Sequence, residues 1–230
     1  MPAANSRPTL PLLLSLNAGF VDTAGFLALQ GLFTAHVTGN FVTLGASLVF
    51  GTSGAVAKLL ALPVFCLVVI LTRLISSALT RLNRPALKIL LGLKVVFLVA
   101  GAVLAIRLGP FVDGDAWQAV VTGMVLVAAM AIQNAAHRIH LGTAPPSTLM
   151  TGTTTQIMID LADMVHAPTV ENVSPPGARL LAMSTNVAVF AAGCAAAALL
   201  YAHIGVWCFV VPPVLGLITP FLRAPAGKSP

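Results

Sequence analysis

Hydrophobic positions along the chain form six long apolar segments and two short ones, separated by polar turns. A helix needs about 20 apolar residues to cross a bilayer, and the long segments meet that length whereas the short ones do not. The short segments cover residues 41–50 and 154–165, and the second is amphipathic. The predicted spans cover residues 10–29, 57–75, 90–106, 117–136, 180–201 and 206–222.

A polar, glycine-bearing break precedes each short segment. The first break is TAHVTGN at residues 34–40, and the second is STLMTGT at residues 147–153. Residues 18–24 (AGFVDTA) also match residues 130–136 (MAIQNAA), which aligns Asp22 with Asn134. With one extra loop residue in the second half, the Thr-Gly pairs of the two breaks align as well. The chain therefore reads as an internal repeat, with halves at residues 1–115 and 116–230.

Composition places the protein in the membrane. Hydrophobic residues make up 58% of the chain and charged residues 8%, and the mean hydropathy is +0.98. A soluble domain carries about 25% charged residues, so we expect an all-α integral membrane protein in contact with the lipid bilayer. The net charge of +6 then indicates membrane orientation rather than nucleic-acid binding. The three cysteines lie in apolar stretches without a metal-ligand pattern, so we expect no metal and no cofactor.

The distribution of Lys and Arg decides between eight full spans and six spans with two re-entrant half-helices. With residues 76–88 placed in the cytoplasm, eight spans leave five basic residues inside and six outside, which is no bias. Six spans leave two outside, Lys58 and Arg107, and nine inside, namely Arg7, Arg73, Arg81, Arg84, Lys88, Arg138, Arg179, Arg223 and Lys228. The sequence therefore predicts six transmembrane helices, two re-entrant half-helices and cytoplasmic termini. Its two halves of three spans become inverted repeats, as in many secondary transporters.

Two re-entrant segments that enter from opposite sides would meet near the middle of the membrane. Irregular backbone at that depth is tolerated where it is buried in protein or lines a water-filled cavity. The positive ends of two half-helices would favour a small anionic or polar solute. The candidate substrate-binding residues are Asp22, His36, Thr38, Gly39, Asn40, Gln133, Asn134, Thr151, Gly152 and Thr153.

Several of these side chains have a structural interpretation beside the functional one. A carboxylate at the depth of Asp22 costs about 3 kcal/mol or more, so we interpret it as a candidate for proton coupling or cation binding. Alternatively, Asp22 caps the free N–H groups of the neighbouring break. Gln133 and Asn134 fit helix–helix hydrogen bonding and solute binding equally well. His36 is a candidate proton relay or a structural hydrogen-bonding group.

Four further polar residues have less specific roles. We interpret Asn17 as a helix-packing or capping residue. His137 and His140, on either side of Arg138, are expected to anchor the cytoplasmic end of their span. Asp160 lies on the second short helix and faces either the predicted cavity or the cytoplasmic rim.

The motifs resemble those of the YoaK-like bacterial membrane proteins, a family of unknown function. The resemblance rests on residues 18–26 (AGFVDTAGF), 36–40 (HVTGN), 130–134 (MAIQN) and 150–153 (MTGT). It implies a multi-pass protein of the bacterial inner membrane and brings no established activity. These proteins tend to be glycine-rich in the span after the first break. Here residues 65–69 contain no glycine, whereas the fifth span has Gly193.

Together these patterns predict a transporter or channel for a small solute. An enzyme is not expected, because the chain has no Ser/His/Asp pattern and no His-rich ligand set. The alternative is a membrane protein with a structural or assembly role that conducts no solute. Residues 191–198, with Gly193, form a small-residue face that packs within the subunit or against a second one. A homodimer is the expected oligomer, because it is the commonest closed assembly.

Overall fold

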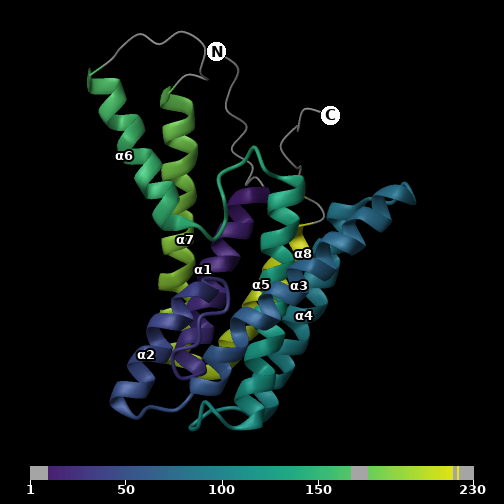
Figure 1. The fold of residues 1–230 in the computed structure, drawn as a ribbon, viewed down its shortest axis with the longest axis vertical. Helices are drawn as coiled ribbons and strands as arrows, with labels where there is room; N and C mark the ends of the chain where they lie inside the picture. Colours follow the sequence, from purple (N-terminus) through teal and green to yellow (C-terminus); the bar gives the residue numbers. More distant parts are fainter. Residues whose placement is uncertain (1–9, 167–175, 220–221, 223–230) are drawn as a thin grey trace.

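The structure, a computed structural model, describes residues 10–166, 176–219 and 222, and within them the chain forms helices and no strands. The α-helices and the two 3₁₀ helices (η) follow one another as a bundle of long rods (Figure 1). They are α1 (Leu10–Ala28), η1 (Val37–Gly39), α2 (Asn40–Phe50), α3 (Ala55–Arg81), α4 (Ala86–Leu108), α5 (Trp117–His140), α6 (Met150–His166), α7 (Pro176–Ile204), η2 (Gly205–Val210) and α8 (Val211–Ile218).

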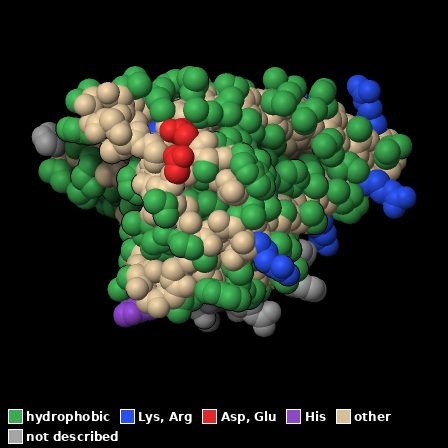
Figure 2. Space-filling model, turned by 90° about the horizontal axis from the view of Figure 1, so that it is seen from below, with side chains coloured by type: hydrophobic (Ala, Val, Ile, Leu, Met, Phe, Trp, Pro, Cys, Tyr) green, Lys and Arg blue, Asp and Glu red, His purple; other side chains and the backbone are tan. Residues whose placement is uncertain are grey.

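The outer surface of the bundle is apolar. Large hydrophobic side chains of α3 point outward, and Leu67, Ile70 and Leu74 are 57%, 57% and 60% exposed. Hydrophobic side chains also cover most of the face in Figure 2. A soluble protein rarely exposes so much contiguous apolar surface. Within the described residues, five helical segments are long and apolar enough to cross a membrane. The expected class of an all-helical integral membrane protein is therefore confirmed.

The helices extend beyond the apolar segments that predicted them. The second predicted span ends at residue 75, whereas α3 continues to Arg81, and α5 continues from residue 136 to His140. A helix keeps its backbone hydrogen bonds regardless of side-chain polarity, so it persists where the apolar run stops.

The predicted sixth span divides into two elements. Its first part is η2, and α8 begins at Val211 with Pro212 and Pro213 in its first turn, where proline has no N–H bond to lose. Gly205 begins η2 with a φ of +56°, in the left-handed region that glycine adopts freely. After this turn, η2 and α8 pack against α4 and α1. By length and composition, α7, η2 and α8 together count as one long apolar segment, Gly177–Ile218.

Loops gather at two ends of the bundle. At the acidic end, defined by residues 29–31, 51–54 and 109–116, the amide Nε2 of Gln30 donates to the carbonyl of Phe111 at 3.0 Å. In the same place the carboxylate of Asp115 accepts hydrogen bonds from the N–H groups of Gly54 and Val56, at 2.9 and 2.8 Å. These bonds hold the start of α3 to the loop between α4 and α5, at the bottom of Figure 1.

The opposite end, the basic end, holds the turn between α3 and α4 at residues 82–85 and the last turn of α5. There Ser76 Oγ and His140 Nε2 lie 2.9 Å apart and share a hydrogen bond. Arg84 and Lys88 line a shallow hollow of about 510 Å³ beside His140. Basic side chains therefore concentrate at the end opposite Asp115.

Two glycines bring α1 and α7 into close contact. A Cβ atom on Gly193 would lie 2.2 Å from the carbonyl oxygen of Leu16, and one on Gly19 would lie 2.2 Å from that of Phe190. Each glycine thus lets the backbone of the other helix approach to a distance that no side chain permits. The small-residue face around Gly193 therefore packs within the subunit, which is the first of the two alternatives that the sequence left open.

Candidate functional site

After α1 ends, the chain of the first break folds back alongside this helix toward the interior of the bundle. Asp22 lies six residues before the end of α1 at Ala28, about 9 Å along the helix axis. Its Oδ1 atom accepts hydrogen bonds from the N–H groups of Thr34 and Ala35, both at 2.7 Å, and of His36 at 3.3 Å. The chain that follows α1 therefore doubles back by more than one helical turn before η1 begins.

This geometry gives Asp22 the capping role that the sequence offered as its structural interpretation. The carboxylate is 6% exposed. Three N–H donors on one oxygen stabilise the charged form of a carboxylate in a place where it would otherwise be costly. The same contacts satisfy N–H groups that the irregular backbone leaves without helix partners.

Asn40 closes the first break from its other side. Its amide is 2% exposed, and it makes two hydrogen bonds with one residue: Oδ1 accepts from the Phe33 N–H and Nδ2 donates to the Phe33 carbonyl, both at 2.8 Å. The side chains of His36 and Thr38 are exposed instead. Gly39 lies against the ring of Phe33, and a Cβ there would be 3.0 Å from it. The first break is thus closed by the side chains of Asp22 and Asn40, and the side chains of His36 and Thr38 make no hydrogen bond to it among the described residues.

The second break follows the same path against α5. Asn134 also lies six residues before the end of its helix, at His140. Its Oδ1 atom accepts a hydrogen bond from Thr148 Oγ1 at 2.5 Å, and its Nδ2 donates to the Met130 carbonyl at 3.0 Å. The aligned residues of the repeat, Asp22 and Asn134, therefore each contact the break that follows their own helix. One does so with a carboxylate and the other with an amide.

Gln133 holds the second break at the centre of the bundle. Its Nε2 donates to the Leu14 carbonyl at 2.9 Å and to Ser147 Oγ at 3.1 Å, and its Oε1 accepts from Lys94 Nζ at 2.5 Å. The side chain thereby joins α1, α4, α5 and the second break. Gln133 is fully buried, so it acts at least as the helix-joining group that the sequence suggested.

Lys94 is a central residue that the sequence interpretation missed. Its side chain is 1% exposed in the middle of α4, and among the described residues no carboxylate pairs with it. Ionisable groups within membrane spans are rare and mark functional sites by default. The single lysine inside residues 90–106 could therefore have been recognised as a candidate functional residue. It was missed because the span was identified from its mean hydropathy, which one lysine lowers only slightly.

Two buried asparagines complete the interior polar network. Asn186 of α7 donates from Nδ2 to the Pro146 carbonyl at 2.8 Å and accepts from Ser15 Oγ at 2.6 Å. Asn17 donates to the Pro212 carbonyl at 3.3 Å, in agreement with its predicted packing role. Asn186 was not among the predicted residues, since one asparagine in an alanine-rich helix carries no positional signal.

A hollow of about 360 Å³ lies beside the second break. His137 lines it and is 6% exposed, and neither of its ring nitrogens has a hydrogen-bond partner in the described part of the chain. The carbonyls of Ala144 and Pro145 lie near the ring without meeting hydrogen-bond geometry. The other lining residues are Phe65, Val69, Asn134, Ala135, Arg138, Gly142, Ala144, Pro146, Ser147, Thr148 and Leu149.

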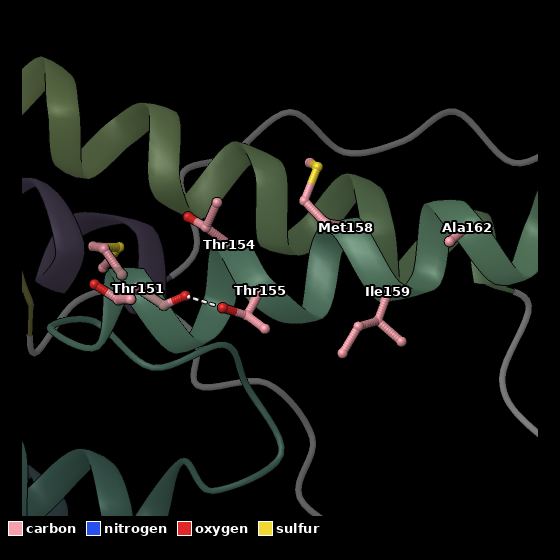
Figure 3. Close-up of a pocket in the computed structure, with 7 residues that line it drawn as sticks. Thr151, Thr154, Thr155, Met158, Ile159 and Ala162 are labelled. Atoms are coloured by element: carbon pink, nitrogen blue, oxygen red, sulfur yellow. Dashed lines mark hydrogen bonds between the residues drawn. The ribbon is translucent and has the colours of Figure 1, made fainter.

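The remaining predicted residues lie apart from this hollow. Thr151 and Gly152 are exposed, and Thr153 is buried, with its hydroxyl donating to the Leu149 carbonyl at 2.9 Å. Thr151 lines a separate open groove in which every lining residue belongs to α6 (Figure 3). Among the residues predicted to surround one cavity, Asn134 alone lines the hollow at the second break.

Asp160 fastens α6 to α7. Its carboxylate is buried and accepts from Arg179 Nε at 2.8 Å, from Arg179 Nη2 at 2.5 Å and from Gln156 Nε2 at 2.7 Å. These hydrogen bonds, first from Arg179 and then from Gln156, hold the pKa of Asp160 below its usual value. Asp160 thus ties two helices together, and it does not line the hollow beside the second break.

Comparisons with known proteins support the membrane class and identify no activity. A family described as "Protein of unknown function (DUF1275)" matches residues 10–222. The UPF0700 transmembrane protein YoaK of Bacillus subtilis (strain 168) is 36% identical over 171 residues, covering 70% of this chain and 70% of that protein. No solved structure matches the chain. The resemblance drawn from the motifs is confirmed.

Proposed function

Because the chain belongs to the family of proteins of unknown function DUF1275, its activity has to be inferred from the molecule, and we propose that it is a transporter or channel for a small solute. The single observation that carries this proposal is the matched depth of the two breaks. Asp22 and Asn134 each bind a break six residues before the end of their helix. Polar, irregular backbone held at this depth is tolerated in a membrane protein where it is buried or lines a solute path.

The packing of the helices supports an inverted repeat. α1 packs on α7 while α5 packs on α3, and α2 packs on α3 while α6 packs on α7. Exchanging the halves 1–115 and 116–230 converts each of these contacts into its counterpart. In Figure 1, α2 runs back toward the acidic end and α6 runs toward the basic end. We propose that both are re-entrant half-helices which enter the membrane from opposite sides, as in transporters built from broken helices.

The two ends of the bundle support an orientation. Arg84 and Lys88 line the hollow at the basic end, whereas Asp115 belongs to the acidic end. By the positive-inside rule the basic end faces the cytoplasm. The proposal then has six spans, cytoplasmic termini and a place in the bacterial inner membrane. The bacterial origin of the transmembrane relative is consistent with that location.

A second candidate function is a structural or assembly role without a conducted solute. The closure of the first break favours it, because Asp22 and Asn40 direct their hydrogen bonds to the break itself. Flux into proteoliposomes separates the two functions. Nitrate, pyruvate and benzenesulfonate stay charged near neutral pH, so their leak through lipid is slow. Uptake above that of protein-free vesicles supports transport, and saturable counterflow identifies a carrier. Uptake equal to that of empty vesicles for all three probes would favour the structural role.

Proton coupling through Asp22 is the finer part of the proposal, and the variant Asp22→Asn tests it. This variant preserves the shape of the side chain and removes its charge. If the carboxylate couples protons, pH-driven uptake is lost while solute exchange persists. If Asp22 only caps the break, pH dependence matches that of the wild type. The second result would remove Asp22 from the transport mechanism and leave it as a structural residue.

A further inference from the structure

We propose that the hollow beside the second break binds a small organic anion, whose acidic head is held by His137 and Arg138 and whose apolar body lies against α3. This inference rests on the proposed function and deepens it, because it assigns a solute class and a binding station to the transporter. It moves the centre of the predicted site from the middle of the membrane to the hollow between α5 and the loop at residues 141–149.

The polar groups around the hollow have donors to spare. A neutral imidazole carries one N–H, and the ring of His137 makes no hydrogen bond of acceptable geometry, although the carbonyls of Ala144 and Pro145 lie near it. The hydroxyl of Ser147 accepts from Gln133 and donates to no described group. Asn134 uses one amide hydrogen on Met130, while its oxygen is occupied by Thr148. Unused donors beside an occupied acceptor favour a ligand that is rich in acceptors.

The charge around the hollow has the same sign. Arg138 lies in its lining with an exposed side chain, and no described carboxylate pairs with it. None of the lining residues is acidic. Guanidinium groups bind carboxylates and sulfonates well, because their planar N–H donors match a pair of oxygens. The ligand head is therefore an anion.

The rest of the hollow has an apolar lining, which favours a ligand with an apolar body. Phe65 and Val69 of α3 line the hollow, together with Pro146 of the loop before the second break and Leu149 of the break itself. A volume of about 360 Å³ lies at the small end of ligand pockets. The hollow thus suits a single acidic group on a short hydrocarbon or aromatic body. A highly charged phosphate compound would leave several oxygens against hydrocarbon, at a high desolvation cost.

Calorimetric titration of the purified full-length protein in detergent tests this assignment. The probe is benzenesulfonate, and its matched neutral control is benzenesulfonamide, which has the same ring without the charge. We expect benzenesulfonate to bind and the sulfonamide to bind at least tenfold more weakly. Failure of benzenesulfonate to bind at millimolar concentration, or equal binding of the two probes, would overturn the proposal.

Variants locate the binding to the hollow. His137→Phe retains a ring of similar shape without its donor, and we expect it to weaken benzenesulfonate binding roughly ten- to a hundredfold, the loss of one hydrogen bond to a charged group. His203→Phe makes the same change at an exposed position on the last turn of α7, and we expect it to bind as the wild type does. Unchanged affinity in His137→Phe contradicts the assignment.

A second variant keeps the proposal testable if His137→Phe does not fold. Arg138→Gln changes an exposed side chain, so the protein is expected to fold, and loss of binding in this variant supports the proposal even if His137→Phe cannot be purified. Retained affinity in Arg138→Gln contradicts it. Binding and flux are read separately. Binding of benzenesulfonate without flux of any of the three probes retains the anion site and refutes transport. Flux that is unchanged in His137→Phe and Arg138→Gln retains transport and refutes the site.

Discussion

The first and second breaks occupy equivalent places in the chain and are held by different chemistry. At the first break, the Asp22 carboxylate accepts hydrogen bonds from three backbone N–H groups, and Asn40 closes the loop with a pair of bonds to Phe33. At the second, the neutral Asn134 accepts one bond from a hydroxyl, and His137 keeps both ring nitrogens without a described partner. The first break is therefore closed, because its polar groups bond to one another. The second break is open, because it leaves hydrogen-bond donors unused beside a hollow.

The difference also extends to charge. The buried ionisable group at the first break is an acid, Asp22, whereas the second break has the imidazole of His137 in its hollow and is linked to the base Lys94 through Gln133. An anion near Asp22 would meet repulsion, while one near Arg138 in the lining of the hollow would be attracted. Two halves with the same backbone path can thus form a site in only one of them, because equivalent positions carry side chains that differ in charge.

The largest expected loss of stability comes from a substitution at the first, closed break. Asp22→Ala leaves three backbone donors without their acceptor, and each unsatisfied buried group costs about 1–3 kcal/mol. We expect the free energy of unfolding, measured by SDS titration in mixed micelles, to fall by about 3 kcal/mol or more. Asp22→Asn keeps an acceptor oxygen and should lose less. A loss below about 1 kcal/mol in Asp22→Ala would show that the first break is not held by this carboxylate.

Overpacking the contact between α1 and α7 should produce the next largest effect. Gly193→Ala places a Cβ atom 2.2 Å from the Leu16 carbonyl, and such crowding costs about 1–3 kcal/mol. The same titration measures it. Gly92→Ala in α4 is the matched control, because a Cβ there meets nothing within 4 Å. Equal stability of the two variants would mean that α1 and α7 are farther apart than described.

Truncation at the second break should cost less than truncation at the first. Asn134→Ala removes the acceptor of the Thr148 hydroxyl, and a neutral hydrogen bond contributes about 1 kcal/mol. We expect a decrease of that size in the free energy of unfolding. A loss as large as that of Asp22→Ala would abolish the distinction between a closed and an open break.

Replacement of the buried base should change stability least. Lys94→Met relieves the cost of a buried ammonium and removes the donor to Gln133 Oε1, and replacing buried ions by apolar residues is often neutral or stabilising. We expect the free energy of unfolding to stay within about 1 kcal/mol of the wild-type value. If the free energy of unfolding falls by about 3 kcal/mol instead, Lys94 serves a structural pairing of the kind whose loss is costly.

Much of the fold could be predicted because hydrophobicity and backbone chemistry are local. The apolar segments located the long helices, and the breaks came after the ends of α1 and α5. The start of the second short helix was misplaced, because α6 begins at Met150 and includes Thr151 and Gly152 of the predicted break. The Asp22–Asn134 alignment also placed both residues against their breaks. Helix ends were less predictable, since α3 reaches Arg81 through hydrogen bonds that do not depend on an apolar surface.

The site was less predictable because it depends on contacts distant in sequence. His137 was expected to anchor a helix end, whereas the loop at residues 141–149 folds over it and buries its ring. Lys94 and Gln133 are 39 positions apart and meet only through the packing of α4 on α5. Local patterns do not encode such meetings, so the sequence indicated polar breaks without showing which one leaves room for a ligand.

The opposite entry of the two breaks is the central claim, and cysteine accessibility tests it most directly. Single cysteines at Gly177 and His203, in a protein whose Cys66, Cys194 and Cys208 are replaced by alanine, are treated with a membrane-impermeant maleimide on intact cells. The proposed topology predicts that His203→Cys reacts from outside and that Gly177→Cys reacts only after the membrane is opened. Val112→Cys and Asn83→Cys, which lie at the acidic and basic ends, are the outer and inner controls. Labelling of Gly177→Cys on intact cells, with His203→Cys protected, would contradict the account and establish eight full spans.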